Sequence, residues 1–162
     1  QLAGLNPIIA VDVMESKLTF AKKMGATHTV DATQKDVVEI LRSITRGGPE
    51  YVFDSVGSAI TVSQSLQSVR PGGKAVIMGL HAAKVEIPLS VATLVLQNKC
   101  LLGSFVGSIR PRLDLPNLMD LYVAGKLALD DLITKQYSLE QVSQAFDDME
   151  SGKVARGVLV FE

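Results

Sequence analysis

The sequence predicts an α/β fold with a doubly wound, mostly parallel β-sheet. Short apolar runs alternate with amphipathic stretches along the 162 residues, and the connections between them are short. This is the pattern of parallel strands joined by crossover helices. Several of the runs are continuously apolar, as expected for strands that are covered on both faces. The expected strands are Ile8–Val13, His28–Asp31, Tyr51–Ser55, Lys74–Gly79, Leu101–Phe105 and Gly157–Phe161.

The helices expected between these strands have recognisable starts and one apolar face each. Ser16, Asp36 and Ser58 are predicted N-cap residues, and Ser138 with Gln141 is predicted to form a capping box. A further helix is expected over 88–97. The expected inward positions are Leu18, Ala21 and Met24; Val37, Ile40, Leu41 and Ile44; Ala59, Val62, Leu66 and Val69; Leu115, Leu118, Met119 and Tyr122; and Val142, Ala145, Phe146 and Met149.

Composition and charge exclude several classes of function. The length suits one domain with a sizeable core, and the net charge of −1 gives no basic surface for nucleic acid. No apolar stretch reaches the ~20 residues of a membrane span, and no signal segment is recognisable. Cys100 is the only cysteine, so an intramolecular disulfide and a zinc site of several cysteines are both excluded. A reducing, cytoplasmic setting is expected.

Asp12 ends the first expected strand, Ile8–Val13. A carboxylate at this place accepts hydrogen bonds from the adenosine ribose of NAD and repels the additional phosphate of NADP. Alternatively, Asp12 only caps the turn into the next helix. Lys17, one helical turn further on, either reaches the same ribose or is a solvated lysine. The usual companion of such a strand, an earlier strand followed by G-x-G-x-x-G, does not occur in the sequence, so the fold is expected to be incomplete, lacking the first strand and the glycine-rich turn.

The ends of later strands hold further candidate positions. Val56-Gly57 and Gly79 fall at the carboxyl edge of the expected sheet, where ligands bind in open α/β folds. The run Gly103–Gly107 either offers backbone carbonyls to a carboxamide or forms an edge strand in a subunit contact. Arg156 precedes the last strand and suits a pyrophosphate, with Arg110 and Arg112 as rivals and surface solvation as the alternative. His28 is expected to be structural, and His81 follows the Gly79 turn, near the expected cofactor.

An ordered series of motifs resembles the zinc-dependent, medium-chain alcohol dehydrogenase family. The series is IIAVDV-x3-K, KKMGATHTVD, YVFDSVG, RPGGKAVIMGL, LLGSFVGS and LYVAGKLALDDLITKQYSLEQVSQAFDDMESGK-x2-RGVLVF. Each motif is weak alone, but their order is specific and covers essentially the whole chain. The chain resembles the carboxyl-terminal part of such an enzyme, with most of its NAD-binding domain in residues 1–106.

The resemblance implies roles for particular residues. Asp12 and Lys17 bind the adenosine ribose, and Val56 lines the adenine and ribose pocket. Backbone groups of Met78, Ser104 and Val106 hold the nicotinamide carboxamide, Leu80 packs on the nicotinamide ring, and Arg156 contacts the pyrophosphate. Residues 107–162 complete the catalytic domain, and the strand Leu101–Phe105 pairs with its copy in a homodimer.

The resemblance also implies what these residues lack. The zinc ligands and proton-relay residues of the family match nothing in this sequence, so the expected function is that of an inactive fragment of an NAD-dependent alcohol dehydrogenase. Zinc belongs to the parent enzyme only, and its substrate is a small alcohol or aldehyde. Two alternatives are a zinc-free medium-chain quinone or enoyl reductase, against which Asp12 argues, and a non-catalytic nucleotide-binding or dimerisation module.

Overall fold

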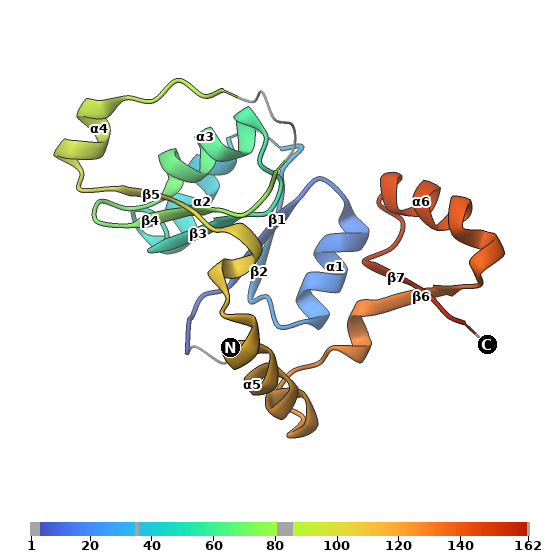
Figure 1. Cartoon of the computed structure of the whole chain (residues 1–162). Coiled ribbons are helices and arrows are strands. Elements are labelled where there is room, and N and C mark those ends of the chain that lie inside the picture. Colours follow the sequence, from blue (N-terminus) through green and yellow to red (C-terminus); the bar gives the residue numbers. More distant parts are fainter. Residues whose placement is uncertain (1–3, 35, 81–85, 162) are drawn as a thin grey trace. The chain divides into compact units, whose positions relative to one another are not determined.

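The computed structural model describes residues 4–34, 36–80 and 86–161 (Figure 1). These residues form two compact units. The N-terminal unit is Leu5–Ile109, and the C-terminal unit consists of the described residues of Gln1–Gly4 and Arg110–Glu162. His81, expected near a cofactor, lies outside the described residues.

The N-terminal unit alternates strands and helices, as the sequence predicts. Its strands all pair in parallel, in the orders β1–β2 and β3–β4–β5. The parallel α/β class is therefore confirmed, but the strands form two separate sheets, and β1 and β3 each keep one edge unpaired among the described residues. The elements are β1 (Ile9–Asp12), α1 (Glu15–Lys23), β2 (His28–Asp31), α2 (Val37–Thr45), β3 (Tyr51–Asp54), α3 (Ala59–Ser68), β4 (Lys74–Ile77), α4 (Val91–Leu96), β5 (Cys100–Gly103) and a 3-10 turn η1 (Phe105–Ser108).

Each sheet of this unit has its own apolar cluster. Val30 of β2 packs with Val37 and Leu41 of α2. Leu66 of α3 and Val69, just beyond it, pack with Ala75 of β4. Burial of these side chains is the main force that holds the helices on the strands.

Helices α2 and α3 pack against each other and join the two clusters. The α3 carbonyl of Gln67 accepts hydrogen bonds from Arg42 Nη2 at 2.8 Å and from Lys99 Nζ at 3.2 Å. Lys99 Nζ also donates to the Leu66 carbonyl at 2.9 Å. Burial, together with the charge of Arg42, lowers the pKa of Lys99. Two cations thus satisfy carbonyls that the end of α3 leaves without helical partners.

The C-terminal unit is a smaller α/β arrangement. Its elements are α5 (Pro111–Val123), the 3-10 turn η2 (Asp130–Leu132), β6 (Ile133–Tyr137), the 3-10 turn η3 (Leu139–Gln141), α6 (Val142–Glu150) and β7 (Arg156–Leu159). β6 and β7 pair in parallel, with a register irregularity between Ile133 and Lys135. β6 was not predicted, because its sequence ITKQY has neither a continuous apolar run nor an alternating one.

The predicted caps are mostly confirmed, but two of the predicted apolar faces are not. Asp36 caps α2 and Ser58 caps α3, whereas α1 begins at Glu15 after Met14, so Ser16 lies inside its first turn. Leu115, Leu118 and Met119 of α5 are 50%, 39% and 52% exposed, so the prediction that they face inward is wrong. The prediction that Phe146 and Met149 of α6 are buried is wrong, since each is 58% exposed. α6 turns its one buried side chain, a carboxylate described below, toward β6 instead.

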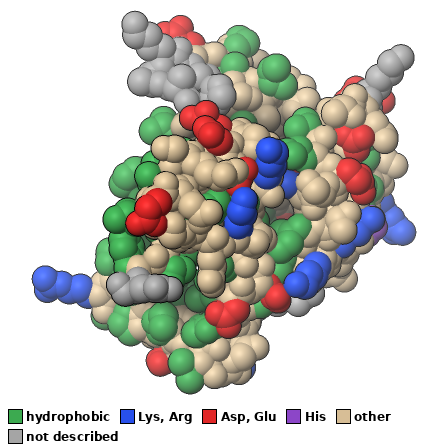
Figure 2. All heavy atoms as spheres, turned by 90° about the vertical axis from the view of Figure 1, so that its right-hand side faces the viewer, with side chains coloured by type: hydrophobic (Ala, Val, Ile, Leu, Met, Phe, Trp, Pro, Cys, Tyr) green, Lys and Arg blue, Asp and Glu red, His purple; other side chains and the backbone are tan. Residues whose placement is uncertain are grey.

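The surface carries mixed charge. On the face drawn in Figure 2, apolar side chains reach the surface between acidic and basic ones. Among the described helices, none has both the length and the apolar character that crossing a membrane requires.

Candidate functional site

Asp12 is the last residue of β1, in register with Asp31 at the end of β2. Its Oδ1 accepts a hydrogen bond from the backbone N–H of Met14 at 3.0 Å, which shapes the turn into α1. The turn-capping role is therefore present. No hydrogen bond to Asp12 Oδ2 occurs among the described residues, so this oxygen is available to a ribose hydroxyl. The exposed Lys17 lies in the first turn of α1, on the same connection.

Asp31 adds a second acid beside Asp12. Its Oδ1 accepts hydrogen bonds from the Thr33 hydroxyl at 2.7 Å and the Thr33 N–H at 2.9 Å. These bonds lower the pKa of Asp31, the side-chain bond contributing most. The carboxyl end of the β1–β2 sheet is consequently anionic.

The carboxyl edge of the β3–β4–β5 sheet is built by backbone turns. Asp54, Ile77 and Gly103 are in register across the three strands, so the residues that follow them leave the sheet at one edge. Asp54 Oδ1 accepts hydrogen bonds from the N–H groups of Val56 at 2.7 Å and Gly57 at 3.0 Å. The Asp54 carbonyl accepts two more, from Met78 and Gly79.

Gly57 and Gly79 bring the two turns into backbone contact. Gly57 has a φ of +74°, and a Cβ there would overlap the carbonyl of Gly79, while a Cβ on Gly79 would overlap the backbone of residues 55–57. Both positions therefore require glycine for packing between the turns. The close approach of a ligand that the sequence suggested at these glycines stays a prediction.

Five of the predicted cofactor-binding residues follow the strands that end at this edge. They are Val56, Met78, Leu80, Ser104 and Val106. Four of them form an apolar rim, with exposed fractions of 51% for Val56, 43% for Met78, 85% for Leu80 and 64% for Val106. Ser104 donates its N–H to the Ile77 carbonyl at 2.9 Å, which extends the strand pairing by one residue. Exposed apolar groups gathered around a strand edge are typical of a surface that a ligand covers.

The backbone at this rim is strained. Val106 has a φ of 49° and Ser108 a φ of 53°, both in the left-handed region. A β-branched residue in that region is uncommon, and such strain concentrates at functional sites.

Asp54, at this edge, has one carboxylate oxygen without a partner in the part of the chain that the structure describes. The residue is 5% exposed, and its Oδ2 is buried without a hydrogen-bond partner among the described residues. Because this oxygen is buried, it is a polar group left unsatisfied inside the turn and not one that the surface offers to a ligand. The groups that this unit offers to a ligand are the open oxygen of Asp12 and the exposed apolar rim.

Arg156, at the start of β7, lies in the C-terminal unit, and its relation to the other predicted residues stays a prediction. Its side chain is exposed, with no acidic partner among the described residues. The rival Arg110 is already engaged, because its Nη2 lies 3.3 Å from Asp114 Oδ1 and its N–H donates to Asp114 Oδ2 at 2.6 Å. Arg156 is therefore better able than Arg110 to bind an anion.

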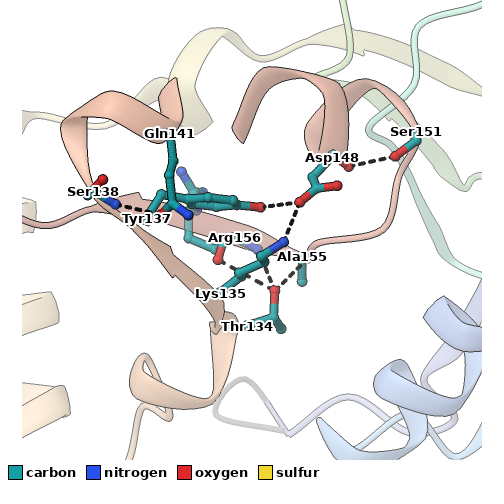
Figure 3. Close-up of polar contacts among 9 residues, drawn as sticks. All are labelled: Thr134, Lys135, Tyr137, Ser138, Gln141, Asp148, Ser151, Ala155 and Arg156. Atoms are coloured by element: carbon teal, nitrogen blue, oxygen red, sulfur yellow. Dashed lines mark hydrogen bonds and ion pairs between the residues drawn. The ribbon is translucent and has the colours of Figure 1, made fainter. Parts of the chain in front are cut away.

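A partly buried polar network in the same unit was missed by the sequence analysis (Figure 3). Asp148 of α6, 4% exposed, accepts hydrogen bonds on Oδ2 from Lys135 Nζ at 2.6 Å and Tyr137 Oη at 2.8 Å. These bonds lower the pKa of Asp148, Lys135 contributing most. The pKa of Tyr137 is raised, first by burial and then by Asp148. No short motif signals the network, because its members are 11 and 13 residues apart.

The described residues do not form a metal centre. Among them, no three His, Cys, Asp or Glu side chains are grouped so that they hold a metal ion. What this part of the chain offers to a ligand is therefore carboxylate oxygens, backbone groups, an arginine and an apolar rim.

Comparison with known proteins identifies the family. Residues 1–124 match the family model of the zinc-binding dehydrogenases. The chain belongs to the zinc-binding dehydrogenase family. Its similarity to a protein named probable S-(hydroxymethyl)glutathione dehydrogenase 1, from Schizosaccharomyces pombe, is 36% identity over 97% of this chain and 42% of that protein. A class-3 alcohol dehydrogenase from Cereibacter sphaeroides is 34% identical over 99% of this chain and 45% of that protein.

Solved structures of zinc-binding dehydrogenases share the fold. The benzyl alcohol dehydrogenase of Acinetobacter calcoaceticus superposes with a TM-score of 0.95 at 31% identity, over 99% of this chain and 44% of that one. A structure described as a zinc-binding dehydrogenase from Sinorhizobium meliloti bound to NADP gives a TM-score of 0.81 at 29% identity, over 89% of this chain and 42% of that one. The chain therefore spans less than half the length of the relatives that it matches.

Proposed function

We propose that this chain is the dinucleotide-binding part of an NAD-dependent alcohol dehydrogenase, which interconverts a small alcohol and its aldehyde. The observation that carries the proposal is Asp12, with one carboxylate oxygen fixed by Met14 and the other open at the carboxyl end of β1. The names of the matched relatives support the alcohol substrate.

The proposed roles follow the family resemblance. Asp12 accepts hydrogen bonds from the adenosine ribose and Lys17 assists it, while Val56 lines the adenine and ribose pocket. The backbones of Met78, Ser104 and Val106 hold the carboxamide, and Leu80 packs on the nicotinamide ring. Arg156 contacts the pyrophosphate. We assign these tasks to residues 1–106 with Arg156, and the completion of the catalytic domain to residues 107–162.

In this proposal the chain supplies the dinucleotide-binding residues, and other parts of the enzyme supply the zinc site. NAD, when bound, accepts a hydride from the carbinol carbon. The residues of this chain bind and orient the dinucleotide, and its apolar rim excludes water from the ring. Zinc in such an enzyme polarises the alcohol oxygen, and its ligands lie outside the described residues.

We propose NAD rather than NADP as the cofactor. An NADP-bound relative has the same fold, so the fold does not discriminate between them. Asp12 and its neighbour Asp31 are both acidic, and a 2′-phosphate beside them meets like charge.

We also propose that the enzyme is a homo-oligomer that pairs through Leu101–Phe105. β5 is an edge strand that pairs only with β4 among the described residues, so its outer backbone groups are open to a second copy. A cytoplasmic location fits the single, exposed Cys100.

Activity measurements test the proposal. We expect the complete protein that contains these residues to oxidise alcohols with NAD and to lose this activity when a chelator removes its zinc. The 162-residue chain alone is expected to bind NAD weakly and to lack activity. Zinc-dependent alcohol oxidation by the 162-residue chain, or its absence from the complete protein, would contradict the proposal.

A further inference from the structure

The side chains of Lys135, Tyr137 and Asp148 form a network in which each contacts the other two. One carboxylate oxygen accepts from both the ammonium and the phenol, and Lys135 Nζ lies 4.9 Å from the centre of the Tyr137 ring. Each pair of the three groups is therefore in contact, and Figure 3 shows them between β6 and α6. Hydrogen bonds of this kind restrict the side chains that form them.

The Tyr137 ring is in turn packed on β7. A Cβ built on Gly157 would lie 2.9 Å from Tyr137 Cε2. Any side chain at position 157 would thus push β7 away from the ring. Lys135 is in register with Gly157, and Tyr137 with Leu159. The two network residues on β6 therefore lie directly beside β7.

A second contact fixes the residue before Gly157. Thr134 lies at the register irregularity of β6. Its hydroxyl accepts hydrogen bonds from the N–H groups of Ala155 at 3.0 Å and Arg156 at 3.4 Å, and it donates to the Arg156 carbonyl at 3.5 Å. The backbone of Arg156 is therefore held by Thr134 on one side and by the Tyr137–Gly157 contact on the other.

We propose that Tyr137, Asp148 and Lys135 are positioning residues that hold Arg156 in place for the pyrophosphate of the dinucleotide. The proposal rests on the function proposed above, in which Arg156 contacts that group. Since the Arg156 side chain is exposed and has no acidic partner among the described residues, its position depends on the strand that carries it. A backbone that is fixed beforehand limits the positions that the guanidinium can take, so less entropy is lost when it binds an anion.

A purely structural role for the network predicts a different result. In that case its loss would lower the melting temperature and leave ligand affinities alone. The positioning role predicts a selective loss of affinity for ligands that contain a pyrophosphate. Competition against NADH by ADP-ribose, which has the pyrophosphate, and by adenosine, which lacks it, separates the two.

The experiment uses the complete protein with Tyr137→Phe, Asp148→Asn and Arg156→Gln. Tyr122→Phe is the matched control, because Tyr122 donates to Asp130 at 2.9 Å in the same unit but lies on α5. Tyr137→Phe removes only the hydroxyl that ties the ring to Asp148, so the ring is still present but is no longer fixed against Gly157, and this variant remains informative if Asp148→Asn does not fold. We expect Arg156→Gln, Tyr137→Phe and Asp148→Asn each to raise the inhibition constant of ADP-ribose about tenfold, with that of adenosine unchanged.

The double variants complete the test. We expect Tyr137→Phe to add nothing in the Arg156→Gln background, since it acts through Arg156. If Arg156→Gln weakens ADP-ribose but Tyr137→Phe and Asp148→Asn do not, the positioning role is wrong and the proposed function stands. If Arg156→Gln itself has no effect on ADP-ribose, the pyrophosphate role of Arg156 fails, and the positioning role fails with it.

Discussion

Asp54 in the N-terminal unit and Asp148 in the C-terminal unit are equally buried acids with opposite surroundings. The Asp54 carboxylate accepts from the backbone N–H groups of Val56 and Gly57 and keeps one oxygen unpartnered among the described residues. The Asp148 carboxylate accepts from the side chains of Lys135 and Tyr137, on a different element. One acid shapes a turn within three residues of itself, and the other ties a helix to a strand. The Asp54 turn is therefore expected to be most sensitive to substitutions that alter the backbone. The Asp148 network is expected to be most sensitive to substitutions of its side chains.

The largest loss of stability is expected at Gly57, where the turn after Asp54 packs against the turn at Gly79. Gly57→Ala adds a Cβ that overlaps the Gly79 carbonyl at a φ of +74°, so the backbone must move. We expect a loss of more than about 3 kcal/mol in the free energy of unfolding, or no folded protein. Urea denaturation of the complete protein measures it.

Gly125→Ala is the matched control for that variant. Gly125 has a similar φ of +68°, but nothing lies within 4 Å of its Cβ position. The left-handed conformation alone costs about 1 kcal/mol. Equal losses for the two variants would show that the contact between the Gly57 and Gly79 turns does not matter.

The next largest loss of stability is expected for substitutions of Asp54 itself. Asp54→Ala removes the acceptor of two backbone N–H groups and is expected to cost about 2–3 kcal/mol. Asp54→Asn retains an acceptor oxygen, and because Oδ2 has no partner among the described residues, it is expected to cost less than about 1 kcal/mol. Denaturation curves that rank the two variants in the opposite order would mean that the charge, and not the acceptor, shapes this turn.

The ion pair between Asp148 and Lys135 predicts a pH dependence of stability. The pKa of Asp148 is lowered on folding, so its stabilising effect is present above its ordinary value of about 3.9 and is lost as pH falls toward the lowered value. The pKa of Lys135 is raised, so its share is lost above its ordinary value of about 10.4. Melting temperatures of wild type and Asp148→Asn should therefore differ most between these limits and converge toward either extreme. A difference that is independent of pH would contradict the ion pair.

The smallest change in stability is expected at Val106, where the backbone of the apolar rim is strained. Val106→Asn keeps the φ of 49° at lower steric cost, because asparagine tolerates the left-handed region. The Val106 side chain is mostly exposed, so little burial is lost. We expect a gain of up to about 1 kcal/mol in the free energy of unfolding. A measured loss of stability would show that the Val106 side chain has a packing role.

The contrast between the two acids also explains what the sequence could predict. The Asp54 turn is local, and the run Tyr51–Gly57 already indicated a strand followed by a turn at the sheet edge. Asp36 and Ser58 were likewise predicted as caps, because their partners lie three residues away. The partners of Asp148 lie on β6, whose sequence has no strand pattern, so neither the strand nor the network was predicted.

Tertiary context accounts for the remaining differences. The apolar runs correctly predicted parallel strands, but local patterns do not say that β1 and β3 stay unpaired with each other. Phe146 and Met149 have helical spacing that predicts burial, and yet the face of α6 that is buried carries Asp148. For the site, five of the predicted residues follow strands that end at one sheet edge, and their contacts with a dinucleotide stay a prediction.

The most direct test of the proposed NAD site is the affinity of the complete protein for NADH and NADPH, with Asp12 intact and replaced in Asp12→Ser. Asp147→Ser, which removes an exposed acid of α6, is the control. We predict that the wild type prefers NADH, that Asp12→Ser reduces this preference about tenfold, and that Asp147→Ser leaves it unchanged. An equal affinity of the wild type for both nucleotides, or a preference that survives Asp12→Ser, would contradict the role of Asp12.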